Sequence, residues 1–260
     1  EVVAVIDFET TGLSPAQGDR ATEIAAVIVE DGRIVDRYQS LMNTGVRIPA
    51  FIEALTGISN AMIRQAPPAA EVMSAVADFV GDYPLVAHNA AFDRPFVEAR
   101  LPAFAAKAWA CSFADIDWKG EGRGSSKLES LAMGLGWFYD AHRAEMDCHA
   151  LLAVLQAELP VARSTGLARL LAAAPTLRYR LQATGAPFDA KDALKERGYR
   201  WDAAQKVWHT RLDSADALHN YAAWHQSQAY GARAARAPVD ALDAVVRYTS
   251  RTGAGDQLDL

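Results

Sequence analysis

Two carboxylates at the end of a buried strand, Asp7 and Glu9, restrict the possible folds most. The run Val2–Asp7 is rich in β-branched residues and predicts that strand. Side chains two residues apart on a strand point to the same face. Two like charges side by side repel each other unless a cation lies between them. The pair therefore indicates a cation site, and its alternative is two solvated acids at a strand end.

Two further acids lie near predicted helix starts. Asp93 occurs in HNAAFD and Asp147 in HRAEMD. Each has an ordinary structural explanation, because Asp93 could cap the helix that contains Pro95, and the helix dipole favours an acid at position 147. His142 taken alone is most simply a surface residue. The order of all five residues along the chain is harder to explain by structure alone.

The hydrophobic pattern predicts an α/β domain with a meander of three strands, followed by strands that alternate with helices. The expected strands are Val2–Asp7, Thr22–Val29, Ile34–Met42, Pro84–Ala87 and Ala105–Cys111. The expected helices are Ala69–Val80, Phe92–Arg100, Lys127–Leu135 and Asp147–Glu158. Such an order is typical of a mixed five-stranded sheet flanked by helices.

The motif order Asp-x-Glu, HNxxFD and HxxxxD resembles the DnaQ-like DEDDh exonucleases, a family with a ribonuclease H-like fold. The resemblance covers residues 1 to about 160 and includes the segments TTGL, IPAFIEALTGIS, KLESLA and AHRAEMD. It implies a 3′→5′ exonuclease in residues 1–174, similar to the epsilon subunit of DNA polymerase III, with a small domain added after it.

The resemblance also implies the roles of the five residues. Asp7, Glu9, Asp93 and Asp147 would hold two divalent cations, Mg²⁺ or Mn²⁺, and His142 would be the general base for the attacking water. Two cations about 4 Å apart can align the water and stabilise the charged transition state. Hard cations prefer oxygen ligands, and an imidazole suits proton transfer near neutral pH.

Residues beside the motifs are expected to bind the substrate: Thr10, Thr11, Leu13, His88 and Asn89. By the resemblance, the backbone after the first motif meets the terminal nucleotide, and Leu13 would wedge between the last bases, since such stacking tolerates any sequence. The alternatives are that Leu13 packs inward and that His88 is a hydrogen-bonded structural residue.

The composition excludes a protein that coats nucleic acid with a basic surface, because the net charge is −6. The charge is uneven, with −8 in residues 1–174 and +2 in residues 175–260, which indicates two domains. The two cysteines, Cys111 and Cys148, form no CxxC pair, so a reducing cytoplasm is the expected location. No apolar run is long enough to span a membrane, and no membrane partner is expected.

Residues 175–251 predict a small α+β domain in the order β-α-β-β-α-β, the ferredoxin-like arrangement. The expected elements are strands at Leu177–Ala183, Tyr199–Trp201, Val207–Arg211 and Ala244–Arg251, and helices at Asp189–Arg197 and Ser214–Tyr230. Phe188–Trp208 interleaves basic and aromatic residues, a pattern that can hold single strands. The preferred interpretation places Trp201 and Trp208 in the domain core.

Residues 252–260 are expected to form a flexible tail. Its last residues, Gln257, Leu258, Asp259 and Leu260, resemble the short peptide by which bacterial replication proteins bind the sliding clamp, without its final Phe. The alternative is an ordinary frayed terminus.

Three function classes follow. The first is an exonuclease at DNA 3′ ends that releases nucleoside 5′-monophosphates in proofreading or repair, with a DNA polymerase as a candidate partner. Within the same chemistry RNA could be the substrate, although the clamp peptide favours DNA. The other two are a non-catalytic scaffold, which the complete set of five residues disfavours, and a nucleic-acid binding module in the C-terminal domain.

Overall fold

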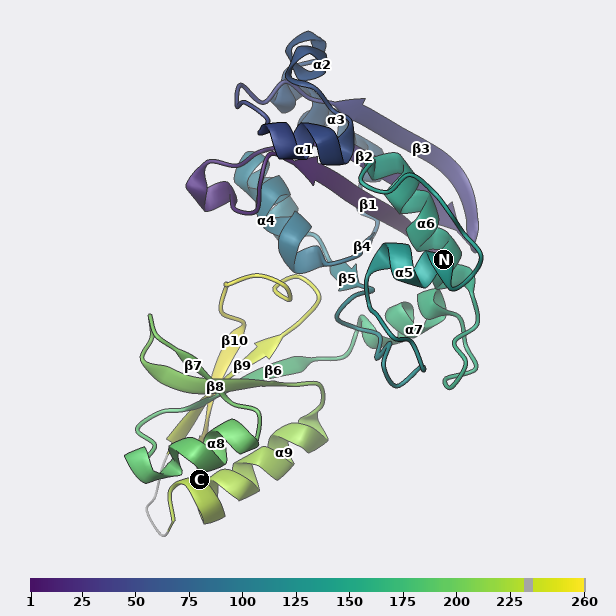
Figure 1. Ribbon diagram of the computed structural model, residues 1–260. Coiled ribbons are helices and arrows are strands. Elements are labelled where there is room, and N and C mark those ends of the chain that lie inside the picture. Colours follow the sequence, from purple (N-terminus) through teal and green to yellow (C-terminus); the bar gives the residue numbers. More distant parts are fainter. Residues whose placement is uncertain (232–235, 260) are drawn as a thin grey trace. The chain divides into compact units, whose positions relative to one another are not determined.

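Two units make up the chain, Glu1–Ala174 and Pro175–Leu260. The computed structural model describes residues 1–231 and 236–259 (Figure 1). Within these residues, no helix combines the length and apolar character needed to cross a lipid bilayer.

Unit 1 contains a five-stranded sheet in the order β3-β2-β1-β4-β5. β1 is antiparallel to β2, β2 is antiparallel to β3, and β4 and β5 continue the sheet in parallel with β1. The sheet is therefore mixed, as predicted. The strands are β1 (Val2–Thr10), β2 (Ala21–Glu30), β3 (Arg33–Leu41), β4 (Leu85–Ala87) and β5 (Trp109–Cys111).

The β2–β3 hairpin shows how local sequence sets this order. Its two turn residues, Asp31 and Gly32, both have positive φ angles, 47° and 79°. A two-residue hairpin of this kind matches the twist of its strands and favours Asp-Gly. The sequence therefore fixes the meander at this point.

Helices cover both faces of the unit 1 sheet (Figure 1). α6 lies along β1 and β2, while α3 contacts β2 and β3, and α4 contacts β4 and β5. The helices of unit 1 are α1 (Ala50–Thr56), α2 (Asn60–Gln65), α3 (Ala69–Val80), α4 (Ala90–Arg100), α5 (Leu128–Met133), α6 (Ala144–Gln156) and α7 (Gly166–Ala173).

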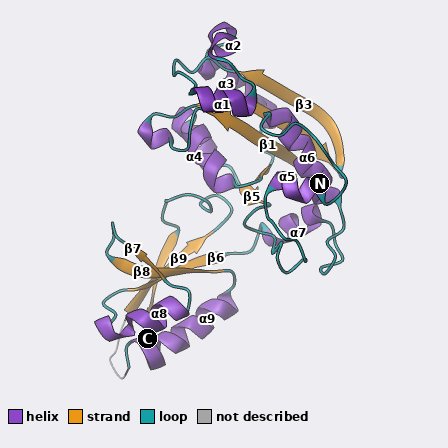
Figure 2. Cartoon of the chain, in the orientation of Figure 1, coloured by secondary structure: helices purple, strands orange, loops and turns teal. Residues whose placement is uncertain are grey.

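Unit 2 contains an antiparallel sheet in the order β10-β9-β6-β8-β7, with α8 and α9 on one face (Figure 2). Its first four strands in chain order and the two helices follow the predicted β-α-β-β-α-β pattern. The elements are β6 (Arg178–Ala183), α8 (Lys191–Glu196), β7 (Arg200–Asp202), β8 (Val207–Leu212), α9 (Ala215–Trp224), β9 (Arg236–Leu242) and β10 (Ala254–Asp259).

Two predictions for unit 2 are wrong. The strand expected at Ala244–Arg251 is a series of turns, and the strand before it, β9, ends at Leu242. The Asp243 carboxylate explains this, because it accepts hydrogen bonds from the backbone N–H groups of Val245 and Val246 (2.9 and 3.1 Å). Such local bonds compete with strand pairing.

The tail expected from Thr252 is likewise not free. Ala254–Asp259 form β10, which pairs with β9 from Ala254 opposite Ala241 to Asp259 opposite Arg236. Leu258 packs against the core of unit 2. Leu260 lies outside the described residues.

Candidate active site

One face of β1 carries both the core and the first two acids. Side chains of alternate strand residues share a face, so Asp7 and Glu9 continue the face of Val3 and Val5. Val3 and Val5 belong to the hydrophobic cluster that also contains residues of α6. β4 pairs with β1 at Ala4 and Val5, which precede both acids in the chain. The two carboxylates therefore lie beyond the part of β1 that pairs with β4.

Helix α6 brings the third acid to the same place. Asp147, Leu151 and Leu155 occur four residues apart and so form one stripe of the helix. Leu151 and Leu155 are buried in the cluster that covers β1. The stripe therefore directs Asp147 at the end of β1. Ligand oxygens of Asp7, Glu9 and Asp147 all lie within 4.8 Å of one another, in a half-buried position.

Asp93 lies beside this group of three rather than within it. It is the fourth residue of α4, whose N-cap is Asn89, so Asp93 is not the helix cap. Its side chain is buried, with the residue only 2% exposed. The Asp93 charge is the strongest electrostatic influence on the pKa of Asp7, after burial. Four carboxylates thus share one electrostatic environment.

Burial and mutual repulsion disfavour ionisation of the four acids. Burial, followed by the neighbouring charges of Asp147 and Glu23, raises the pKa of Glu9 to about 8. Burial and the charge of Asp93 raise the pKa of Asp7 well above its ordinary value. Burial also raises the pKa of Asp93 and Asp147. Such a cluster is stable in its ionised form only beside positive charge.

The donor set fits hard divalent cations. Asp7, Glu9, Asp93 and Asp147 offer only carboxylate oxygens, which suit Mg²⁺ or Mn²⁺. The thiol of Cys148, which follows Asp147 in the chain, is buried, and its sulfur lies 3.7 Å from each of the backbone oxygens of Val5 and Ala25. A soft ligand is therefore kept out of the group.

Both oxygens of Asp147 are held by the loop before α6. The Tyr139 hydroxyl donates to Oδ1 and the His142 backbone N–H donates to Oδ2, each at 3.0 Å. His142 itself is exposed and has a φ of 69°, a left-handed backbone conformation. The backbone of His142 therefore orients Asp147, and its imidazole is open to solvent next to the acids.

Glu23 is a site residue that the sequence analysis missed. It lies opposite Glu9 in the β1–β2 register and is 1% exposed. Its carboxylate accepts hydrogen bonds from Nη2 of the Arg143 guanidinium, at 2.9 Å, and from the backbone N–H of Ala144, at 2.7 Å. Because Ala144 begins α6, Glu23 fixes the start of the helix that carries Asp147. A charged residue within the buried run Ala21–Val29 was the available signal.

The two threonines after the first motif hold the loop. Thr10 Oγ1 donates to the Gly12 carbonyl at 2.7 Å, and Thr11 Oγ1 donates to Asp19 Oδ1 at 3.2 Å. Both threonines are buried, whereas Leu13 is 84% exposed. The alternative that Leu13 packs inward is therefore wrong.

His88 and Asn89 shape the start of α4. The His88 ring nitrogens lie 2.8 Å from Ser112 Oγ and 2.8 Å from the Ser126 carbonyl, so both have protein partners. Burial lowers the pKa of His88 to about 4, and the ring is therefore neutral. Asn89 adopts a left-handed conformation with φ of 71°. His88 is thus the hydrogen-bonded structural residue of the alternative interpretation, and it braces the loop.

Three of the four predicted C-terminal site residues lie in a strand of unit 2. Gln257, Leu258 and Asp259 lie in β10. In the same unit, Trp208 packs against the core, as expected. Trp201 is 52% exposed, so its assignment to the core is wrong.

Comparisons with known proteins place this geometry in context. Residues 4–155 match the exonuclease family RNase_T. The chain is 46% identical over 97 residues to the 3′-5′ exonuclease DinG of Bacillus subtilis, covering 37% of this chain and 10% of that protein. It is 45% identical over 97 residues to the PolC-type DNA polymerase III of Bacillus cereus, covering 37% of this chain and 7% of the polymerase. The matched part of the chain thus spans about a tenth or less of the length of these relatives.

A solved structure supports the fold. The zinc-bound complex of Escherichia coli exonuclease I with single-stranded DNA superposes with a TM-score of 0.53 and 16% identity, over 71% of this chain and 48% of that one. This likeness agrees with the ribonuclease H-like arrangement of the sheet and its helices.

Proposed function

The chain belongs to the RNase_T exonuclease family, and from that premise we propose that it removes nucleoside 5′-monophosphates from DNA 3′ ends with the aid of two divalent cations. The single observation that carries this proposal is the meeting of Asp7, Glu9 and Asp147 within 4.8 Å, with Asp93 beside them. These acids come from three separate segments of the chain, β1, α4 and α6. Acids that served only as solvated surface residues would have no reason to gather from three segments.

Each residue has a defined task. Asp7, Glu9, Asp93 and Asp147 would hold two cations, Mg²⁺ or Mn²⁺, which when bound supply positive charge to the attacking water and to the phosphate. His142 accepts the proton of that water at an imidazole nitrogen, because its ring is exposed beside Asp147. Tyr139 and the His142 backbone keep the Asp147 carboxylate in place.

The loop after β1 would receive the end of the strand. Thr10 and Thr11 use their hydroxyls within the loop, which leaves backbone groups and the exposed Leu13 to meet the last nucleotide. Asn89 flanks Asp93 at the start of α4 and would contact the substrate from there. His88 supports this segment through Ser112 and Ser126.

DNA is the proposed substrate, in proofreading or repair, because the relatives include PolC-type DNA polymerases. A DNA polymerase is the proposed partner on the same ground. RNA is the second candidate, since one fold neighbour is a 3′-exonuclease recognising a histone mRNA stem-loop, with a TM-score of 0.51. Sliding-clamp binding through Gln257–Leu260 remains a prediction from sequence, and it requires β10 to separate from β9.

The direct test uses 5′-labelled single-stranded DNA, duplex DNA and RNA, each with Mg²⁺, with Mn²⁺ or with EDTA. We expect stepwise shortening of DNA from the 3′ end with either cation and none with EDTA. Asp7→Asn is the matched control because it keeps the shape of the side chain while removing its charge. Equal shortening by Asp7→Asn, or no shortening of any substrate, would refute the proposal.

A further inference from the structure

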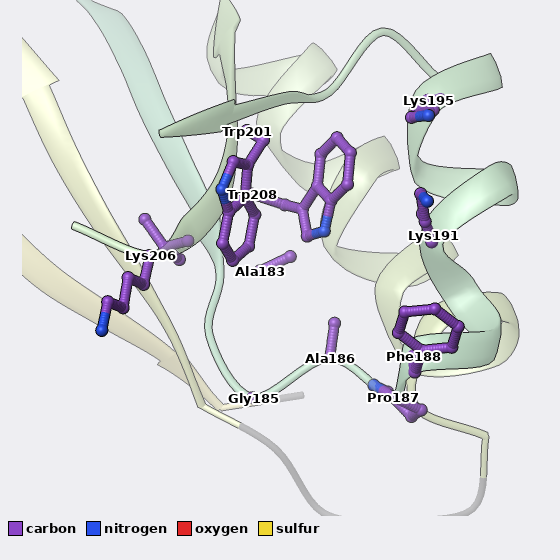
Figure 3. A pocket seen from close by; sticks show the side chains of 11 residues that line it. Ala183, Gly185, Ala186, Pro187, Phe188, Lys191, Lys195, Trp201, Lys206 and Trp208 are labelled. Atoms are coloured by element: carbon purple, nitrogen blue, oxygen red, sulfur yellow. The ribbon is translucent and has the colours of Figure 1, made fainter. Parts of the chain in front are cut away.

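Unit 2 contains a cavity of about 590 Å³ between the β7–β8 hairpin and the start of α8. Its size lies within the range of about 300–1,000 Å³ that is usual for ligand sites. Figure 3 shows the rings of Trp201 and Trp208 facing the side of the cavity where Phe188, Lys191 and Lys195 lie. All of these residues belong to unit 2.

Exposed aromatic rings mark the cavity. Phe188 is 83% exposed and Trp201 is 52% exposed, although large aromatic side chains usually gain most from burial. Trp201 contacts Trp208, with ring centroids 5.5 Å apart, and Trp208 is anchored on the core. Trp201 is therefore held at the surface by a fixed neighbour, with part of its ring free for stacking.

The charged side chains that line the cavity are all positive. Among the described residues, those that line it include Lys191, Lys195 and Lys206 and no carboxylate. No salt bridge within the described part of the chain engages these three lysines. The Lys191 ammonium lies 5.7 Å from the centre of the Phe188 ring. A ligand with both a planar ring and a negative charge would complement this surface.

Hydrogen bonds on the opposite face stabilise the β7–β8 hairpin that carries the two tryptophans. Asp202 Oδ1 accepts hydrogen bonds from the backbone N–H groups of Ala204 and Gln205, each at 2.9 Å. Asp202 Oδ2 also accepts one from Arg180 at 3.1 Å. These bonds fix the turn that presents Lys206, so the cavity is formed before any ligand binds, which lowers the entropic cost of binding.

We propose that this cavity binds single-stranded nucleic acid, with a base stacked on Trp201 and backbone phosphates near Lys191 and Lys195. Every base has a face that can stack, and lysines attract phosphates of any sequence, so this site is independent of sequence. The proposal goes beyond the exonuclease function, because it assigns a separate binding site to unit 2.

The test measures fluorescence anisotropy of a 5′-fluorescein-labelled 12-nucleotide oligothymidylate with the full chain in EDTA, where the proposed cleavage cannot occur. Trp201→Ala is expected to weaken binding about 5- to 150-fold, from the usual loss per stacked base, and Trp201→Phe to restore most of it. The double variant Lys191→Gln, Lys195→Gln should lower the slope of log affinity against log salt by about 1.4.

Arg200→Gln is the matched control. Arg200 is exposed and precedes Trp201 on the same strand, so it points to the opposite face of the sheet. Lys195→Gln should weaken binding more than Arg200→Gln does. No binding by the wild type, unchanged affinity of Trp201→Ala, or equal effects of Lys195→Gln and Arg200→Gln would overturn the proposal.

The two proposals fail separately. Hydrolysis of the p-nitrophenyl ester of thymidine 5′-monophosphate with Mg²⁺, compared between the wild type and Asp7→Asn, reports on unit 1 alone. Thermal unfolding of each unit 2 variant shows whether the fold is kept. If the oligonucleotide binds as expected but the ester is not hydrolysed, only the exonuclease proposal fails. If the ester is hydrolysed but the unit 2 variants do not change oligonucleotide binding, only the cavity proposal fails.

Discussion

At the scale of single residues, His142 has two parts that serve the candidate site in different ways. The backbone of His142 donates to Asp147, while its imidazole is exposed. The backbone of His142 is left-handed, and its N–H lies 3.0 Å from Asp147 Oδ2 in α6. The backbone role survives a change of side chain, so the two roles can be separated by mutation.

His142→Ala should therefore remove proton transfer without removing cation binding. Loss of a general base costs about 10²–10⁴-fold in turnover. Single-turnover rates at neutral pH and calorimetric titration with Mn²⁺ would measure the two effects. His149→Ala is the control, because His149 lies on α6, the helix that carries Asp147, and contacts Glu145 rather than Asp147. A wild-type rate for His142→Ala would contradict the assignment.

At the scale of elements, the position of α6 depends on one buried charge. The Glu23 carboxylate accepts hydrogen bonds from the Arg143 guanidinium, from the backbone N–H of Ala144 and from the side-chain amide of Gln39, the last at 2.9 Å. The hydrogen bond from Arg143 to Glu23 raises the pKa of the guanidinium, which stays charged. A strand residue and a helix start 120 positions apart are thereby joined.

Arg143→Met should destabilise unit 1 by about 2–3 kcal/mol, below the 3–5 kcal/mol of a fully buried pair, because the Arg143 side chain is 40% exposed. The double variant Glu23→Gln, Arg143→Met should recover much of this loss, because no unpaired charge then stays buried. Urea unfolding of the wild type, Glu23→Gln, Arg143→Met and the double variant forms a double-mutant cycle. This cycle measures the coupling free energy between Glu23 and Arg143. Strict additivity would show that the pair does not hold α6.

Strand β10 makes a second element-scale prediction. Leu258 packs against the core of unit 2, whereas Gln257 is exposed and lies on the opposite face of the strand. Leu258→Asp should lower the free energy of unfolding by about 1–2 kcal/mol, and Gln257→Asp should change it by less than about 0.5 kcal/mol. Equal melting temperatures of the two variants would indicate that β10 is not part of the folded unit.

At the scale of the whole molecule, the carboxylate cluster links stability to pH and to cations. The folded chain raises the pKa of Glu9 to about 8, from 4.5. Protons therefore bind the folded state more tightly than the unfolded state. The stabilisation from this proton is complete below about pH 4.5 and is lost as the pH rises through about 8. Above that pH, the proposed cations would offset the charge of the ionised acids in place of the protons.

Mg²⁺ should therefore raise the melting temperature more at pH 8.5 than at pH 6. At a concentration of 100 times the dissociation constant, the gain at pH 8.5 would be about 2.7 kcal/mol, or about 5–10 °C. Differential scanning fluorimetry across the two pH values measures it. Glu9→Gln is the control, since it should raise the melting temperature of the cation-free chain at pH 8.5. Equal Mg²⁺ shifts at the two pH values would contradict the linkage.

Local patterns were enough to predict much of this molecule. The strand Val2–Asp7 with its following acids, the Asp31–Gly32 turn and the alternation of later elements follow from periodicity and turn chemistry, which act over a few residues. The failures lie where a local signal met a competing contact. Asp243 turned a predicted strand into turns, and pairing with β9 ordered a predicted tail.

By itself, the sequence predicted Asp7, Glu9, Asp93 and Asp147 as one candidate cation-binding set and placed each acid near the end of a strand or the start of a helix. Only the tertiary structure decided that the stripe of α6 aims Asp147 at Asp7 and Glu9, that Glu23 is paired by Arg143, and that Trp201 stays at the surface beside a lysine-lined cavity. The physical reason is the separation along the chain between the residues that interact. Strand and helix periods are set by neighbouring residues, whereas contacts across 100 positions depend on how packed faces meet.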